Sequence, residues 1–135
     1  MDMERLKRDI TRREGLRLEV YDDHLGNPTI GVGRLLSRGI TETTAMQMLE
    51  EDIDIVLNEL KEQLPWFDDM PERVQEALVD LGFNLGVPRL MKFELTLGFL
   101  QKRKFVDAAE ELLNSRYATQ VPNRALEIAK VIANA

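Results

Sequence analysis

Residues 13–36 read REGLRLEVYDDHLGNPTIGVGRLL, and this stretch decides the fold. An acid, Glu14, closes an amphipathic segment and is followed by Gly15, which can end a helix in a left-handed conformation. A second acid, Asp23, lies in a run of turn-forming residues. Thr29 then opens a glycine-spaced segment with β character. The stretch therefore delivers two carboxylates and a hydroxyl from a helix end, a turn and a strand.

This set of groups suits glycoside hydrolysis, in which one carboxylic acid protonates the leaving oxygen and a second carboxylate handles water or the sugar cation. Each residue also has an ordinary structural explanation. Glu14 can be an exposed acid in a last helical turn, where the helix dipole disfavours it. Asp23 or its neighbour Asp22 can form an Asx-turn, and Thr29 can be a β-branched strand residue. The spacing alone leaves both explanations open.

Composition limits the remaining possibilities. The chain has 135 residues, of which 44% are hydrophobic and 31% charged, as expected for one globular domain with its own core. It has no cysteine, so disulfides and thiolate chemistry are excluded. The only histidine, His24, cannot build a metal site by itself, and we expect no cofactor and no metal. The net charge of −6 argues against a nucleic-acid-binding protein.

The amino-terminal segment is charged throughout and lacks the apolar core of a signal peptide. No apolar run approaches the roughly 18 residues that a membrane span requires. We therefore expect no signal peptide, no transmembrane segment and no stable membrane insertion.

The hydrophobic pattern predicts a mostly helical chain with one short β region. A helix is expected up to Glu14, followed by a hairpin or small sheet from about 17 to 36. The predicted helices after it are a long amphipathic one over about 41–63, one that opens at Pro71 and is broken at 86–88, two near 93–101 and 105–114, and a last one from Pro122.

Three further blocks accompany the first: GFNLG at 82–86, FLQKRKFVDAAEELLNSRY at 99–117 and QVPNRA at 120–125. In this order the four blocks resemble the phage-type lysozymes, the T-even phage endolysin family of muramidases. The resemblance implies an α+β, mostly helical, two-lobe lysozyme-like fold with a cleft between the lobes. The resemblance also implies a single domain over 1–135. Its parts are a β-containing lobe at about 13–40, a connecting helix at about 41–63, and a helical lobe at about 66–135 packed with the N-terminal helix.

The activity implied by the resemblance is hydrolysis of the β-1,4 bond between N-acetylmuramic acid and N-acetylglucosamine in peptidoglycan. Glu14 takes the place of the family's catalytic acid, and Thr29 that of its catalytic hydroxyl. Asp23 takes the place of the second carboxylate, because the motif without gaps selects it over Asp22. The sequence leaves open whether the reaction inverts or retains the anomeric configuration.

The same resemblance suggests where the sugar is contacted. Leu35, Phe83 and Thr96 fall at cleft positions of the family. Asn84 lies beside Phe83 and offers an amide to an acetamido group. Glu111 replaces a family asparagine.

Two ion pairs are also implied by the resemblance. Arg124 aligns with an arginine that pairs with the catalytic glutamate, here Glu14. Arg34 stands where better-known members have histidine, and Asp52 occupies the position of that histidine's acidic partner. Because guanidinium and carboxylate bond bidentately, we expect an Arg34–Asp52 pair with a structural role.

The implied partner is the peptidoglycan substrate, attacked by a monomer that binds no nucleic acid. The family precedent is accumulation in the host cytoplasm and release to the cell wall through a separate holin-type partner. The acidic charge departs from the basic charge of well-known members, and we expect weaker steering toward an anionic wall. The alternatives are a catalytically silent wall-binding module, a lytic transglycosylase that needs neither Asp23 nor Thr29, and a helical adaptor without a polar cleft.

Overall fold

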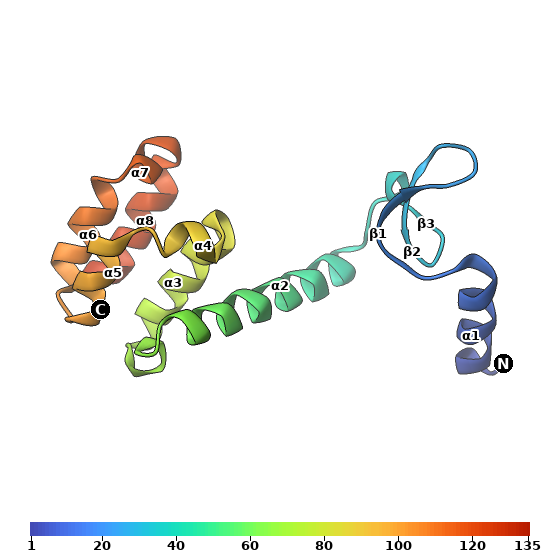
Figure 1. Ribbon diagram of the computed structural model, residues 1–135, viewed down its shortest axis with the longest axis horizontal. Coiled ribbons are helices and arrows are strands. Elements are labelled where there is room, and N and C mark those ends of the chain that lie inside the picture. Colours follow the sequence, from blue (N-terminus) through green and yellow to red (C-terminus); the bar gives the residue numbers. More distant parts are fainter. The chain divides into compact units, whose positions relative to one another are not determined.

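The computed structural model describes all residues, 1–135, and divides into two compact units, Met1–Met46 and Gln47–Ala135. The fold is α+β, as predicted from the sequence (Figure 1). The elements in chain order are α1 (Met3–Glu14), β1 (Arg17–Asp22), β2 (Pro28–Gly31), β3 (Arg34–Leu35), the 3₁₀ turn η1 (Leu36–Arg38), α2 (Glu42–Gln63), η2 (Phe67–Asp69), α3 (Glu72–Leu85), α4 (Val87–Leu90), α5 (Glu94–Gln101), α6 (Phe105–Leu113), α7 (Arg116–Gln120) and α8 (Pro122–Ala133).

The first unit begins with α1, whose two ends are both capped. Asp2 is the N-cap and accepts a hydrogen bond from the Arg5 backbone N–H at 3.0 Å. Gly15 ends the helix with φ of 83° and donates its N–H to the carbonyl of Thr11. The helix therefore stops directly after Glu14, and the end of α1 fixes where this acid leaves the helix.

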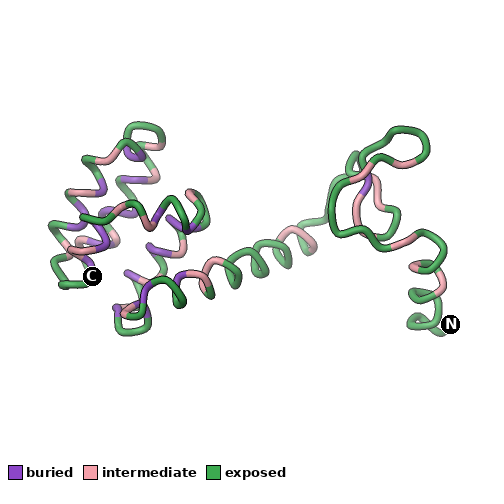
Figure 2. The backbone as a smooth tube through the Cα atoms, in the orientation of Figure 1, coloured by how far each residue is buried: buried purple, intermediate pink, exposed green.

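An antiparallel sheet in the order β1-β2-β3 completes the first unit, and the predicted hairpin is thus a three-stranded sheet. Thr29 lies in the central strand, opposite Tyr21 of β1 and Leu35 of β3. Thr29 is only 2% exposed and is the one buried residue of this unit, where Figure 2 shows a single buried segment. Thr29 is therefore the buried centre of the sheet, with a partner residue on each neighbouring strand.

Helix α2 confirms the long helix predicted over about 41–63. Thr41 precedes it and accepts a hydrogen bond from the Thr44 N–H, as an N-cap does. Only Leu60 of α2 is buried, although apolar residues recur along the helix at helical spacing. The helix begins in the first unit and continues in the second, and the division into lobes drawn from the sequence stays a prediction.

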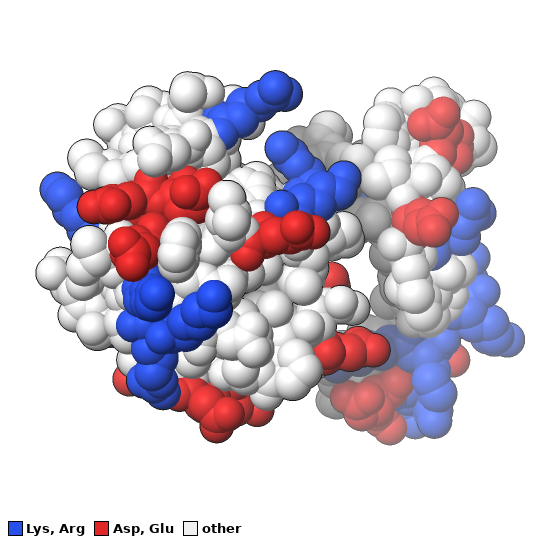
Figure 3. Space-filling view, turned by 60° about the vertical axis from the view of Figure 1, so that its left-hand side comes forward, with Lys and Arg blue, Asp and Glu red and all other residues white.

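The second unit has a helical core. Helix α6 packs against α5 and α8, and α8 also packs against α3. Their inward residues are fully buried, and each large aliphatic side chain removed from water stabilises the fold by about 2 kcal/mol. Acidic and basic side chains are interspersed on the outer surface of this unit (Figure 3). The largest fully buried side chains of the core are those of Leu60, Phe67, Val74, Leu78, Leu81, Leu90, Leu100, Leu112 and Ile132.

Two short helices differ from the sequence-based expectation. The break predicted at 86–88 ends α3, with Gly86 as its C-cap at φ 83°, but α4 begins at once. Pro88 lies in the first turn of α4, where its missing N–H costs nothing. Helix α7, at Arg116–Gln120, is too short to produce a periodic pattern. No helix of the chain is both long and apolar enough to span a membrane.

Candidate active site

Glu14, the predicted catalytic acid, is the last residue of α1 and is exposed. Its side chain lies over the backbone of Gly33, in the turn between β2 and β3. Its Oε2 atom is 2.8 Å from the point where a Cβ on residue 33 would stand. The acid is therefore held against the same sheet that carries Thr29.

Asp23, the predicted second carboxylate, is fixed by the turn between β1 and β2. Its Oδ1 accepts the backbone N–H of Leu25 at 2.9 Å and that of Asn27 at 2.8 Å. The bond from Asn27 is the main reason that the pKa of Asp23 is lowered; the Leu25 N–H and the charge of His24 act in the same direction, while desolvation opposes them. Both backbone bonds go to Oδ1, so Oδ2 accepts neither of these backbone N–H groups.

Asn27 connects Asp23 with Thr29. The Asn27 carbonyl accepts the Asp23 backbone N–H at 2.9 Å and the Thr29 hydroxyl at 2.8 Å. One carbonyl thus holds the backbone of Asp23 and the side-chain hydroxyl of Thr29. Asn27 was not predicted as a site residue from the sequence. The feature that could have indicated it is the Asx-turn predicted for the residues around it.

Asp22 occupies a different environment from Asp23. It is the exposed last residue of β1, paired in register with Pro28, and its side chain makes no hydrogen bond. Leu35, a predicted sugar contact, lies directly opposite Thr29 in the sheet. Cross-strand partners present their side chains on the same face, so Leu35 and Thr29 are neighbours.

The two predicted ion pairs join residues of different units and stay predictions. Within the first unit, Arg34 Nη2 donates to the carbonyl of Gly39 at 3.0 Å and closes the segment after β3. Within the second unit, Arg124 donates to Asp80 Oδ1 from Nε at 2.9 Å and from Nη2 at 2.5 Å. Sequence reasoning missed Asp80 as a partner of Arg124. This pair ties α8 to α3.

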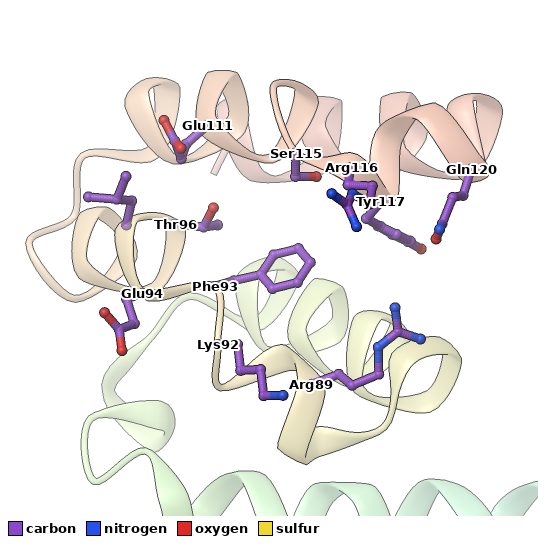
Figure 4. Close-up of a pocket in the computed structure, with 11 residues that line it drawn as sticks. Arg89, Lys92, Phe93, Glu94, Thr96, Glu111, Ser115, Arg116, Tyr117 and Gln120 are labelled. Atoms are coloured by element: carbon purple, nitrogen blue, oxygen red, sulfur yellow. The ribbon is translucent and has the colours of Figure 1, made fainter.

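A cavity of about 420 Å³ in the second unit is lined by one of the predicted substrate contacts, Thr96 (Figure 4). Thr96 and Glu111 line it with the rings of Phe93 and Tyr117, which pack edge to face. Burial raises the pKa of the Tyr117 hydroxyl, and that hydroxyl donates to Asn84 Oδ1 at 2.9 Å. Tyr117, which sequence reasoning missed, therefore links Asn84 to the cavity that Thr96 lines.

Charged side chains surround this cavity. Figure 4 shows Glu94 and Glu111 near one end and Arg89, Lys92 and Arg116 toward the other. None of the five takes part in an ion pair. The cavity thus offers unpaired charges of both signs to a polar ligand.

Phe83 lies in a different environment, on the wall of an apolar cavity of about 540 Å³. Its side chain is 43% exposed, and the wall continues with Leu49, Ile53, Leu57 and Val79. The chain has no group of three His, Asp or Glu side chains placed to hold a metal ion.

Comparison with known proteins decides the family. Residues 11–128 match the family model described as phage lysozyme. The chain belongs to the phage lysozyme family. The match includes Glu14, Asp23 and Thr29, and the resemblance noted from the sequence is confirmed.

Individual relatives agree with this assignment. The chain is 27% identical to a probable T4-type lysozyme 2 of Dictyostelium discoideum, with 87% of each chain covered. It is 25% identical to the probable T4-type lysozyme 1 of the same organism, with 88% of each covered. It is also 26% identical to the pre-baseplate central spike protein Gp5 of Enterobacteria phage T4, over 91% of this chain and 26% of that protein. The chain is a glycoside hydrolase of the lysozyme type, and its family hydrolyses cell-wall peptidoglycan.

Proposed function

We propose that this lysozyme cleaves the β-1,4 bond between N-acetylmuramic acid and N-acetylglucosamine, with Glu14 as general acid and with Asp23 and Thr29 as the groups that handle water and charge. The observation that carries the proposal is the shared Asn27 carbonyl, which holds the backbone of Asp23 and the hydroxyl of Thr29 together. A lowered pKa keeps Asp23 ionised at neutral pH.

In the proposed reaction Glu14 gives a proton to the glycosidic oxygen as the bond to the anomeric carbon breaks. Positive charge then develops on the sugar ring, and the ionised Asp23 stabilises it or orients the attacking water. The water oxygen bonds to the anomeric carbon and releases a proton to a carboxylate. Thr29 assists because its hydroxyl oxygen, which donates to Asn27, keeps lone pairs that can accept from water.

The proposed substrate contacts divide by chemistry. Leu35 offers an apolar surface beside Thr29. Asn84, which accepts a hydrogen bond from Tyr117, and Thr96, which lines the same cavity as Tyr117, offer polar groups for the sugar substituents. Phe83 offers an aromatic face. We further propose that the lysozyme acts as a monomer and reaches the wall from the host cytoplasm through a separate holin-type partner, as the family resemblance suggests.

The test is clearing of a cell-wall suspension combined with mass spectrometry of the products. Wild type should clear the suspension and release saccharides with a reducing end. Glu14→Gln should lose activity, because an amide cannot protonate the leaving oxygen, while Glu19→Gln on exposed β1 should clear as wild type does. Asp23→Asn should lose activity, and Asp22→Asn should retain it.

The alternative functions predict other results. Equal clearing by Glu14→Gln and wild type would show that Glu14 is not the general acid. Products ending in anhydromuramic acid, with Asp23→Asn still active, would identify a lytic transglycosylase. Binding to the wall without any clearing would identify a silent wall-binding module.

A further inference from the structure

We propose that Gly33 is a positioning residue for Glu14: the absence of a side chain at residue 33 lets the carboxylate of Glu14 lie against the turn between β2 and β3. The catalytic consequence of this inference rests on the function proposed above. The contact itself does not, because it is a property of the first unit alone.

The geometry leaves no room for a methyl group at residue 33. A Cβ there would stand 2.8 Å from Glu14 Oε2, 3.4 Å from its Cδ and 3.6 Å from its Cβ. Carbon and oxygen atoms do not approach to 2.8 Å without strong repulsion unless they are bonded. The atom that is hit ends a flexible side chain, so an added methyl would displace the carboxylate rather than the backbone.

Gly31, two residues before Gly33, provides a control for the effect of a side chain at residue 33. Strands β2 and β3 pair as Thr29 with Leu35 and Ile30 with Arg34. Gly31 is the last residue of β2, and residues 32–33 form the turn that follows it. Gly31 and Gly33 both have positive φ, at 73° and 63°. A Cβ at Gly31 would meet no atom within 4 Å. Only one of the two glycines therefore has the carboxylate lying over it, although both need the same backbone conformation.

The experiment compares Gly33→Ala with Gly31→Ala. Both variants force a side chain into a left-handed conformation, so both should lower the thermal midpoint by similar amounts. Only Gly33→Ala should shift the ¹³C resonance of the Glu14 carboxyl group. Only Gly33→Ala should also lower kcat, by about a hundredfold, because a small displacement of a catalytic group has effects of this size. KM should stay close to the wild-type value in both variants.

A double variant tests whether the loss of kcat in Gly33→Ala is caused by displacement of Glu14. Glu14→Asp shortens the side chain, and adding Gly33→Ala to it should cause a smaller further loss of kcat than Gly33→Ala causes in wild type. The inference is overturned if the two alanine variants lose activity equally, or if the Glu14 resonance is unchanged in Gly33→Ala. If the wild-type chain cleaves no glycan, the proposed function fails, while the resonance comparison still decides the role of Gly33.

Discussion

At the scale of single residues, the two predicted acids differ in how they are held. Glu14 is exposed and placed by a steric gap over Gly33, whereas Asp23 is held by backbone donors. A carboxylate that accepts backbone N–H bonds favours its charged form. The turn chemistry therefore supports the proposal that Asp23 acts in its ionised form.

A titration can check this assignment for Asp23. Its pKa is lowered from the ordinary value of 3.8, so the ¹³C midpoint of its carboxyl group should lie below that value. The unfolded chain binds this proton at higher pH than the folded chain does. The stability that Asp23 contributes is therefore present above pH 3.8 and is lost as the pH falls through the folded midpoint. A midpoint above 3.8 would contradict the proposed role of the turn.

Substitutions at Thr29 can distinguish the effect of its hydroxyl group from the effect of its side-chain shape. Thr29→Val keeps the volume but removes the donor to Asn27, which should cost about 1 kcal/mol of stability and most of the activity. Thr29→Ser keeps the donor and should retain much of the activity. Urea unfolding and wall clearing measure the two effects. Equal activity in the valine and serine variants would show that the hydroxyl is not used.

At the scale of elements, one hydrogen bond joins α7 to α3 beside the cavity that Thr96 lines: Tyr117 donates to Asn84. Tyr117→Phe should destabilise the chain by about 1 kcal/mol at neutral pH. Because burial raises the pKa of Tyr117, its contribution is complete below the unfolded pKa of about 10 and is lost as the pH rises through the folded pKa. The stability advantage of wild type over Tyr117→Phe should therefore shrink above pH 10, as chemical unfolding at several pH values would show.

Sequence patterns predicted the elements that are long or marked by caps. The end of α1 at Gly15 and the opening of α3 after Pro71 follow from local backbone chemistry. Helix α4 was not predicted, because Gly86 ends α3 while Pro88 lies in the first turn of the next helix instead of interrupting the chain. Helix α7 was not predicted, because a five-residue helix shows no period. The acids and the hydroxyl proposed for the site come from one motif in the sequence. Their contacts with Asn27 and Gly33 were not predicted, since those depend on how the sheet brings separate residues together.

At the scale of the whole molecule, the net charge of −6 sets how the lysozyme meets an anionic wall. We expect the initial rate of wall clearing to rise between about 10 and 100 mM salt, as the Debye length falls from about 30 Å to about 10 Å and repulsion is screened. Glu50→Lys with Glu51→Lys, both exposed on α2, should raise the rate at low salt and flatten this dependence. A rate that falls steadily with salt in wild type would contradict the expectation.

The closed turn that holds Asp23 has a further consequence for the lifetime of the protein. Exposed loop tips are usual sites of proteolytic cleavage, because a protease must draw the chain into an extended form. Here the backbone N–H groups of Asp23, Leu25, Gly26 and Asn27 are all bonded within the turn, and Thr29 secures its far end. Opening it for cleavage would break these bonds together, so we expect the segment that holds the Asp23 carboxylate to resist digestion.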